Sequence, residues 1–249
     1  MIDTILFDMG GTLEDLLITE QTKKNTGKEI LRMLKVAGLD PQTDADSLWE
    51  KAEAGMNRYS AYRDPLGVEL KPERIWCDFI LKDFDLDNDK LTAIAEDLAY
   101  MWEVTYYQRS VRPTTKAMLQ GLKELGMKVG IISNTASLFQ VFQQLKDYGI
   151  RDYFDDVTLS SITGYRKPHP GMFYVSLHQL QSKAENSIYV GDTISRDVIG
   201  AKNAGLAKTI QIGSFLTRLK DTEAAGKAKP DYFIEDIYEV YGIAKECSK

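Results

Sequence analysis

The sequence predicts an α/β protein, in which a parallel β-sheet carries helices on both faces and an all-helical segment is inserted after the first strand. Two observations favour this fold class. Short apolar strands alternate with helical segments after residue 109, which is typical of parallel sheets. Another apolar strand begins the chain, and the long stretch that follows it, residues 16–108, has apolar residues at helical spacing.

The first predicted element is the strand 2–7, a short apolar run. It ends in Asp8-Met9-Gly10-Gly11-Thr12, whose adjacent glycines indicate a tight turn. Helical periodicity follows, with no clear strand between the segments, at 28–36, 44–62, 73–82 and 90–107. We therefore expect residues 16–108 to form a separate helical domain.

The second half of the chain alternates between strands and helices. Helices are expected at 114–125, 137–148, 171–180 and 195–204, and strands at 128–132, 156–159, 187–190, 207–212 and 232–234. Residues 1–15 and 109–249 are therefore predicted to form one α/β core domain with a Rossmann-like sheet.

Composition and charge narrow the function classes. The 249 residues include 37 acidic and 31 basic side chains, and the net charge of -6 argues against nucleic acid or an anionic membrane as the main partner. The two cysteines, Cys77 and Cys247, are too isolated for a disulfide framework or a zinc site. Asp3 and Asp8 interrupt the apolar stretch that a secretory signal needs, and no membrane-spanning run occurs. We expect a cytoplasmic monomer or homodimer.

Polar residues follow several of the predicted strands, where ligands bind in parallel sheets. They are Asp8, the pair Ser133 and Asn134, Lys167 in a loop, and Asp192, which precedes Asp197 on the next helix. Three gathered carboxylates would repel one another, so a hard divalent ion such as Mg²⁺ is expected among them. The basic and short polar side chains would then bind the oxygens of a phosphoryl group.

Together these segments resemble a known family. Phe7-Asp8-Met9-Gly10-Gly11-Thr12-Leu13, Ile132-Ser133-Asn134, Arg166-Lys167-Pro168 and Val190-Gly191-Asp192-Thr193 with Asp197 resemble, in order and spacing, the four motifs of the haloacid dehalogenase-like (HAD) hydrolases. The helical segment after the first motif is similar to that family's helical cap. The resemblance implies a Mg²⁺-dependent phosphatase for a small phosphorylated metabolite that works through a phospho-aspartate.

The resemblance also implies a role for each motif residue. Asp8 would attack phosphorus, and Mg²⁺ would be held by Asp8, the main-chain carbonyl of Gly10 and Asp192, with Asp197 as a further carboxylate of the metal site. A carboxylate is ionised at neutral pH, and nearby cations are expected to lower the pKa of Asp8 further.

The phosphate-binding groups are implied in the same way. They would be the Gly11 N–H, Ser133, Asn134 and Lys167, and Lys167 would also neutralise Asp8. Ser133 and Asn134 also have a plainer interpretation as caps of the following helix.

Gly10 departs from the family pattern, because phosphatases of the family carry a second Asp two residues after the nucleophile. That Asp protonates the leaving oxygen and later activates water, which is typically worth roughly 10²–10⁴-fold in rate. Its loss leaves several alternatives open. The substrate could be an acyl or phenolic phosphate, whose leaving group needs little protonation. Glu14 or Asp15 could act as the acid in place of the missing Asp, or the protein could be a slow enzyme or a non-catalytic phosphate binder. Dehalogenase or phosphonatase chemistry is also permitted.

The helical segment is expected to recognise the rest of the substrate. Arg58 and Arg63 are its best cationic candidates, and its aromatic residues are interpreted mainly as core. A phosphonatase would need a lysine for a Schiff base, and Lys23, Lys24 and Lys28 cannot be ranked for it. His169 and His178 are interpreted as structural or surface residues.

Overall fold

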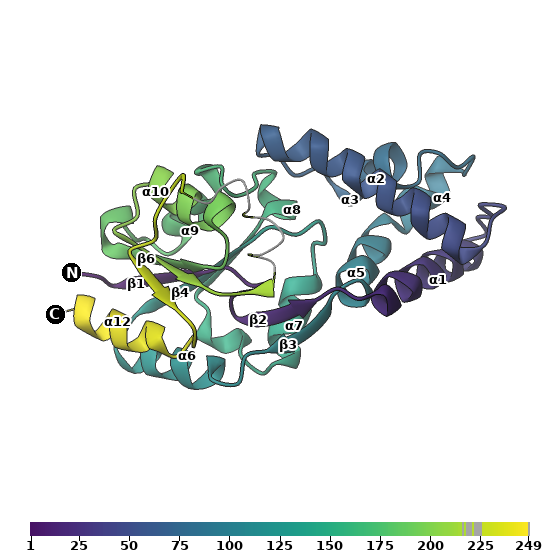
Figure 1. Cartoon of the computed structure of the whole chain (residues 1–249). Coiled ribbons are helices and arrows are strands. Elements are labelled where there is room, and N and C mark those ends of the chain that lie inside the picture. Colours follow the sequence, from purple (N-terminus) through teal and green to yellow (C-terminus); the bar gives the residue numbers. More distant parts are fainter. Residues whose placement is uncertain (216, 218–220, 222–225, 249) are drawn as a thin grey trace.

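The structure is a computed structural model that describes residues 1–215, 217, 221 and 226–248. Figure 1 shows an α/β part that carries both chain ends and, beside it, a group of helices formed by residues 20–105. Strands β2 and β3 run between the two parts.

The main sheet has six strands in the order β5-β4-β1-β6-β7-β8, and every neighbouring pair is parallel. The strands are β1 (Thr4–Phe7), β4 (Lys128–Ser133), β5 (Asp156–Leu159), β6 (Ser187–Gly191), β7 (Lys208–Ile212) and β8 (Tyr232–Ile234). The central strand β1 is buried on both faces, which explains its continuous apolar character. The predicted fold class is confirmed.

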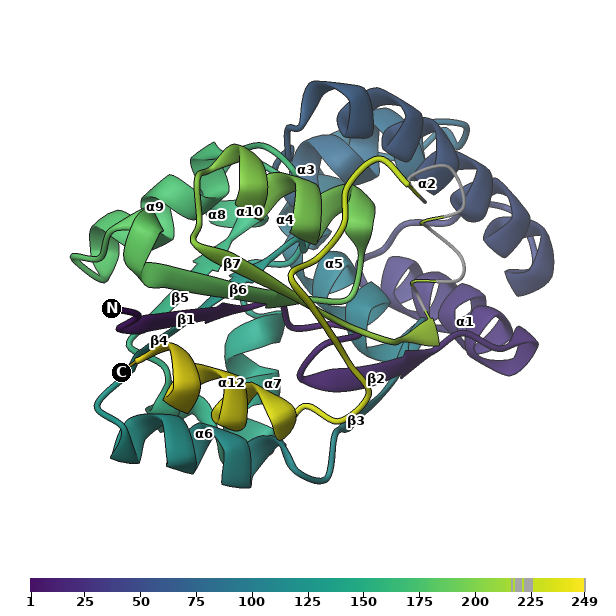
Figure 2. The ribbon, with the colours of Figure 1, turned by 60° about the vertical axis from the view of Figure 1, so that its left-hand side comes forward.

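Helices cover both faces of this sheet (Figure 2). One face carries α6 (Thr115–Glu124), α7 (Gln140–Asp147) and α12 (Glu239–Cys247), and the other carries α8 (Ser160–Thr163), α9 (Gly171–Gln179) and α10 (Ile199–Asn203). Side chains alternate accordingly along β1: Ile5 and Phe7 join the apolar cluster under α6, whereas Leu6 joins the cluster under α9. Two short 3₁₀ turns complete this part, η2 (Arg151–Tyr153) and η3 (Ala184–Asn186).

The inserted helices have an apolar core of their own. They are α1 (Glu20–Val36), α2 (Ala45–Leu66), α3 (Pro72–Ile75), the π-helical turn η1 (Trp76–Ile80), α4 (Asn88–Ala93) and α5 (Ala95–Thr105). Trp49, Tyr59 and Trp102 are among the aromatic residues of this core. Asp44 caps α2 by accepting hydrogen bonds from two backbone N–H groups of its first turn.

Two strands were not predicted. β2 (Glu14–Leu17) and β3 (Gln108–Val111) pair antiparallel at the two ends of the inserted segment. Each has only four residues and is partly polar, so neither gives a strand-like pattern in the sequence. Both strands flank the predicted helical segments, and among the described residues no strand lies between those segments. The predicted helix 195–204 is also divided, into the π-helical turn η4 (Ile194–Val198) and α10.

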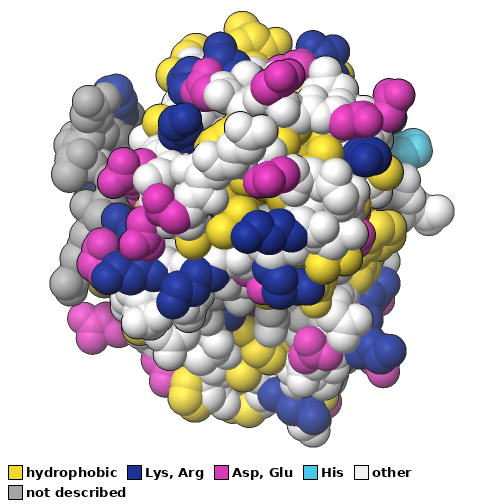
Figure 3. Space-filling model, turned by 90° about the vertical axis from the view of Figure 1, so that its right-hand side faces the viewer, with side chains coloured by type: hydrophobic (Ala, Val, Ile, Leu, Met, Phe, Trp, Pro, Cys, Tyr) yellow, Lys and Arg dark blue, Asp and Glu magenta, His cyan; other side chains and the backbone are white. Residues whose placement is uncertain are grey.

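The outer surface over the inserted helices is mixed in charge. Figure 3 shows acidic and basic side chains intermingled on this end of the molecule, with apolar atoms scattered between them. None of the described helices combines the length and the apolar content that crossing a bilayer requires.

Candidate active site

Lys167 and Asp8 meet at the carboxyl end of the sheet. Asp8 directly follows β1, and Lys167 lies in the loop between α8 and α9. The Lys167 Nζ lies 2.8 Å from Asp8 Oδ1, 2.7 Å from Asp197 Oδ1 and 2.7 Å from the Tyr189 hydroxyl oxygen. Lys167 is buried, and its three N–H bonds are therefore all directed at these partners.

Asp197 is saturated with hydrogen bonds. Its Oδ1 accepts from Lys167 and from the Tyr189 hydroxyl, and its Oδ2 accepts from the backbone N–H and the hydroxyl of Thr193. A carboxylate offers about four acceptor positions, so protein groups occupy them all. The lack of a side chain at Gly191 makes this packing possible, because a Cβ there would overlap the Asp197 side chain. With these acceptor positions occupied, Asp197 is better placed to hold Lys167 in position than to act as the predicted metal ligand.

Asp192 has an acceptor atom that the described residues leave unpaired. Its Oδ2 accepts a hydrogen bond from Ser214, whereas its fully buried Oδ1 has no partner. Carboxylate oxygens of Asp8, Asp192 and Asp197 all lie within 4.8 Å of one another. Burial, together with Asp197 and Asp8, raises the pKa of Asp192 to about 7. A divalent cation would coordinate the unpaired Asp192 Oδ1 and offset the repulsion between the carboxylates. The site is therefore suited to binding such an ion.

The pKa of Asp8 differs from the sequence expectation. Burial raises it, Lys167 lowers it and Asp197 raises it again, and the net direction is upward. Lys167 lowers this pKa as predicted, but desolvation, which the prediction left out, outweighs the single ammonium group.

The predicted phosphate ligands divide into two groups. The Ser133 hydroxyl, at the end of β4, makes no hydrogen bond to another described residue and borders the same small cavity as Asp8. In contrast, the Gly11 N–H donates to the Glu14 carbonyl at 2.9 Å. Asn134 donates to the Lys167 carbonyl and accepts from the Lys167 N–H, at 3.0 and 2.9 Å. Gly11 and the Asn134 amide are thus engaged in holding loops, and the interpretation as phosphate ligands is not supported for them.

Two unpaired donors in this cavity lie outside the predicted set. The Gly10 N–H has no acceptor among the described residues, and Gly10 borders the cavity. Arg196, on η4, borders both this cavity and the larger one beside it, and it makes no ion pair or hydrogen bond to another described residue. Burial alone would lower the pKa of Arg196, but Asp197, Asp192 and Asp8 outweigh it and raise that pKa. In the sequence, only the position of Arg196 directly before Asp197 indicates that it could belong to the site.

Neither predicted substitute acid reaches the centre. The Glu14 carboxylate is buried and is held by Arg109 and by the Tyr148 hydroxyl, the latter at 2.7 Å. Burial raises the pKa of Glu14 despite these partners. Asp15 is exposed and pairs with Arg112 at 3.0 Å.

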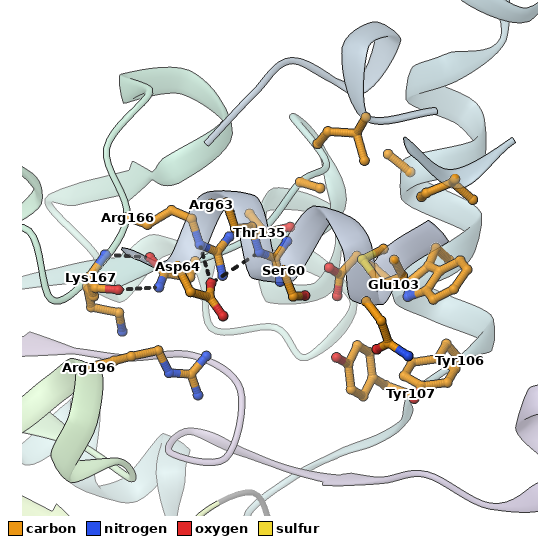
Figure 4. Close-up of a pocket in the computed structure, with 18 of the residues that line it drawn as sticks. Ser60, Arg63, Asp64, Glu103, Tyr106, Tyr107, Thr135, Arg166, Lys167 and Arg196 are labelled. Carbon is orange, nitrogen blue, oxygen red and sulfur yellow. Dashed lines mark hydrogen bonds and ion pairs between the residues drawn. The ribbon is translucent and has the colours of Figure 1, made fainter. Parts of the chain in front are cut away.

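A cavity of about 720 Å³ extends from Lys167 and Arg196 into the inserted helices. Figure 4 shows the Arg196 guanidinium pointing toward the space between Lys167 and Tyr107, with Tyr106 on the far side. Arg63 borders the cavity as expected, although its Nε lies 3.3 Å from Asp64.

Several other candidates lie elsewhere. Arg58 pairs with Asp83 at 2.7 Å, and His169 stacks on Tyr165 with ring centres 4.5 Å apart. Neither borders the cavity, and the same holds for His178, Lys23, Lys24 and Lys28.

Comparisons with known proteins identify the family to which this chain belongs. A family model described as haloacid dehalogenase-like hydrolase matches residues 2–205. The glyceraldehyde 3-phosphate phosphatase of Methanopyrus kandleri is 27% identical over 251 residues, covering 100% of both chains. The ribulose-1,5-bisphosphate 5-phosphatase of Halopiger xanaduensis is 31% identical over 209 residues, covering 83% of each. A HAD phosphatase structure from Thermococcus onnurineus has a TM-score of 0.63 at 25% identity, covering 97% of each chain. This chain belongs to the haloacid dehalogenase-like hydrolase family.

Proposed function

We propose that the protein is a Mg²⁺-dependent phosphatase of small phosphate monoesters, with Asp8 as the nucleophile. The observation that carries this proposal is the clustering of Asp8, Lys167 and the half-paired Asp192 at one buried point of the described structure. The names of the two relatives, both phosphatases of phosphorylated metabolites, support it.

The metal would be held by one oxygen each from Asp8 and Asp192 and by the Gly10 carbonyl. Oxygen ligands of this kind suit Mg²⁺, which also keeps several waters. When bound, the ion would offset the carboxylate charges and stabilise charge on the phosphoryl oxygens. The saturated Asp197 would stay outside this ligand set and hold Lys167 in position.

The two oxygens of Asp8 would have different tasks. Oδ1 accepts from Lys167 and, at 2.7 Å, from the Met9 N–H, whereas Oδ2 has no partner among the described residues. We assign the attack to Oδ2: the bond from Oδ2 to phosphorus forms, and the bond from phosphorus to the leaving oxygen breaks. Water then attacks phosphorus, which releases phosphate and restores Asp8.

The transferring phosphoryl group would be bound by donors that have no partner among the described residues. These are the Ser133 hydroxyl, the Gly10 N–H and the Arg196 guanidinium. Because Lys167 directs its three N–H bonds at protein oxygens, Arg196 is the cation most available for the phosphate.

We also infer that residues 16–108 form a cap domain over the core domain of residues 1–15 and 109–249. Support comes from the separate apolar core of the inserted helices and from the β2–β3 junction through which the chain enters and leaves them.

Phosphate release from a panel of monoesters, with and without Mg²⁺, tests the proposed function. Asp8→Asn should abolish turnover, whereas the exposed neighbour in Asp15→Asn should leave it within about twofold, in line with the small effect of most surface changes. Turnover that survives in Asp8→Asn would remove the nucleophile assignment. Chloride release from a 2-haloacid, without Mg²⁺ dependence, would instead support chemistry at carbon.

A further inference from the structure

We propose that the substrates are aryl phosphates, monoesters whose leaving oxygen is attached directly to an aromatic ring. This inference rests on the proposed phosphatase function and specifies its substrate class. It combines two independent features of the site, the shape and lining of the large cavity and the absence of a suitable acid around it.

The cavity has cationic, aromatic and polar lining residues. Lys167 and Arg196 border it, and the inserted segment contributes polar side chains such as Glu53, Asn57 and Ser60 together with an aromatic and aliphatic wall: Met56, Ile75, Trp76, Ile80, Trp102 and Tyr106. Its volume of about 720 Å³ lies within the range of sites for drug-sized ligands, roughly 300–1,000 Å³, and greatly exceeds what a three-carbon phosphate fills.

The aromatic wall contains rings that already pack against one another. The ring centres of Trp102 and Tyr106 are 5.2 Å apart, and those of Trp76 and Trp102 are 6.0 Å apart in an edge arrangement. A flat substrate ring would continue this packing and exclude water from the wall.

The described lining residues offer no acid that is ready to protonate a leaving oxygen. Gly10 has no side chain, and the carboxylates of Glu53, Asp64 and Glu103 are each paired with a cation. Burial raises the pKa of the Tyr107 phenol to about 12, far above the neutral range in which a general acid is most efficient.

An aryl leaving group removes the need for such an acid. A phenol has a pKa of about 10, whereas an alcohol is about as weakly acidic as water, near 15. In the proposed step Asp8 Oδ2 bonds to phosphorus, the phosphorus–oxygen bond breaks, and the electron pair leaves on the phenolate oxygen. Solvent then supplies its proton.

Four substrates that vary the ring and the leaving group separately test the proposal with the full-length protein and Mg²⁺. Phenyl phosphate has a ring and a good leaving group, benzyl phosphate a ring and a poor one, acetyl phosphate no ring and a good one, and ethyl phosphate neither. We expect kcat/KM for phenyl phosphate to exceed that for benzyl phosphate by at least about a hundredfold. It should also exceed that for acetyl phosphate by at least about tenfold.

The outcomes separate this inference from the proposed function. Comparable rates with phenyl and benzyl phosphate would show that the protein protonates the leaving group, and a preference for acetyl phosphate would show that the wall binds no ring. Either result would overturn the aryl phosphate assignment while leaving the phosphatase intact. Inactivity toward all four substrates would contradict the phosphatase itself.

A pair of variants, one within α5 and one at the residue directly after it, tests the role of the wall. Tyr106→Ala should lower the ratio of kcat/KM for phenyl phosphate to that for acetyl phosphate by about tenfold. Tyr100 lies on α5, the helix that Tyr106 directly follows; it is also half-buried and does not border the cavity, so Tyr100→Ala should leave the ratio unchanged. Equal ratios in the two variants would contradict a ring site at Tyr106, and circular dichroism would verify that both remain folded.

Discussion

The side chain of Leu16 occupies the space beside Gly10 into which a longer residue there would project. A Cβ on Gly10 would lie 2.8 Å from Cδ1 of Leu16 and 3.9 Å from Oε1 of Glu14. Gly10 has no left-handed backbone conformation, so the obstacle to a side chain is this one flexible terminus. The missing acid and the leucine that fills its place are therefore one local feature of the turn and strand β2.

This relationship predicts how an acid could be restored. In Gly10→Asp/Leu16→Ala the new carboxyl has room beside Asp8, and we expect hydrolysis of benzyl phosphate to rise by at least about tenfold. Phenyl phosphate should gain much less, because its leaving group needs little protonation. Leu16→Ala alone is the control, and steady-state rates are the measurement. Equal increases in the rates for benzyl and phenyl phosphate would show that the new carboxyl does not act as a general acid.

Asp192 and Asp197 should respond differently to Mg²⁺. The unpaired Asp192 oxygen is free for an ion, whereas all acceptor positions of Asp197 are occupied by protein donors. We expect Mg²⁺ to raise the thermal unfolding midpoint of the wild type and of Asp197→Asn, but not that of Asp192→Asn. In Asp197→Asn, kcat should fall because Lys167 is less firmly held. If Mg²⁺ instead stabilised Asp192→Asn but not Asp197→Asn, Asp197 would be the metal ligand and Asp192 would not.

Asp192 should also make the metal-free protein sensitive to pH. Its pKa is about 7 in the folded state, against an ordinary value of 3.8, so the folded state holds the proton more tightly than the unfolded state. Its contribution to stability is then fully present below pH 3.8 and is lost as the pH rises through about 7. The amide in Asp192→Asn cannot titrate.

With a chelator present, the unfolding midpoint of Asp192→Asn should therefore exceed that of the wild type by about 3 °C or more at pH 8. The difference should shrink toward about pH 5. Differential scanning calorimetry at the two pH values measures it. A pH-independent difference would mean that Asp192 is not a source of repulsion in the metal-free site.

The sequence reveals those elements of the fold that carry their own pattern. β1, β4 and β6 are buried on both faces, so their apolar runs are visible without knowing their neighbours. The pair β2 and β3 is not visible, because four partly polar residues form a strand only when a partner about ninety positions away supplies hydrogen bonds. The short length of each strand hides the junction through which the chain enters and leaves the inserted helices.

The same distinction applies to the site. Asp8, Ser133, Lys167 and Asp192 follow from the rule that ligands lie at the carboxyl ends of parallel strands. The role of Asn134 in holding the loop does not follow from that rule. It depends on hydrogen bonds between the Asn134 amide and the backbone of Lys167, 33 residues away. Hydrogen-bond partners of this kind are set by tertiary packing, and residue type alone does not identify them.

Arg196 offers the sharpest test of how the phosphoryl group is bound. Arg196 is the cation that borders both cavities and makes no ion pair with a described residue. The negative charges of Asp8, Asp192 and Asp197 raise its pKa. In the resting protein its guanidinium helps to balance these carboxylates; with substrate bound it would donate to phosphoryl oxygens. Loss of a charged hydrogen bond of this kind costs about 1.5–3 kcal/mol, or roughly tenfold to a hundredfold in affinity.

We therefore expect Arg196→Gln to raise the inhibition constant of inorganic phosphate by roughly tenfold to a hundredfold. Arg196→Lys should recover part of this loss, since it restores the charge without the planar pair of donors. Arg32→Gln is the matched control, because Arg32 is exposed and pairs only with Glu29 on α1. Phosphate affinity that is unchanged in Arg196→Gln would leave Lys167 as the phosphate-binding cation. One of its three protein contacts would then have to break when substrate binds, because its N–H bonds are all engaged in the free protein.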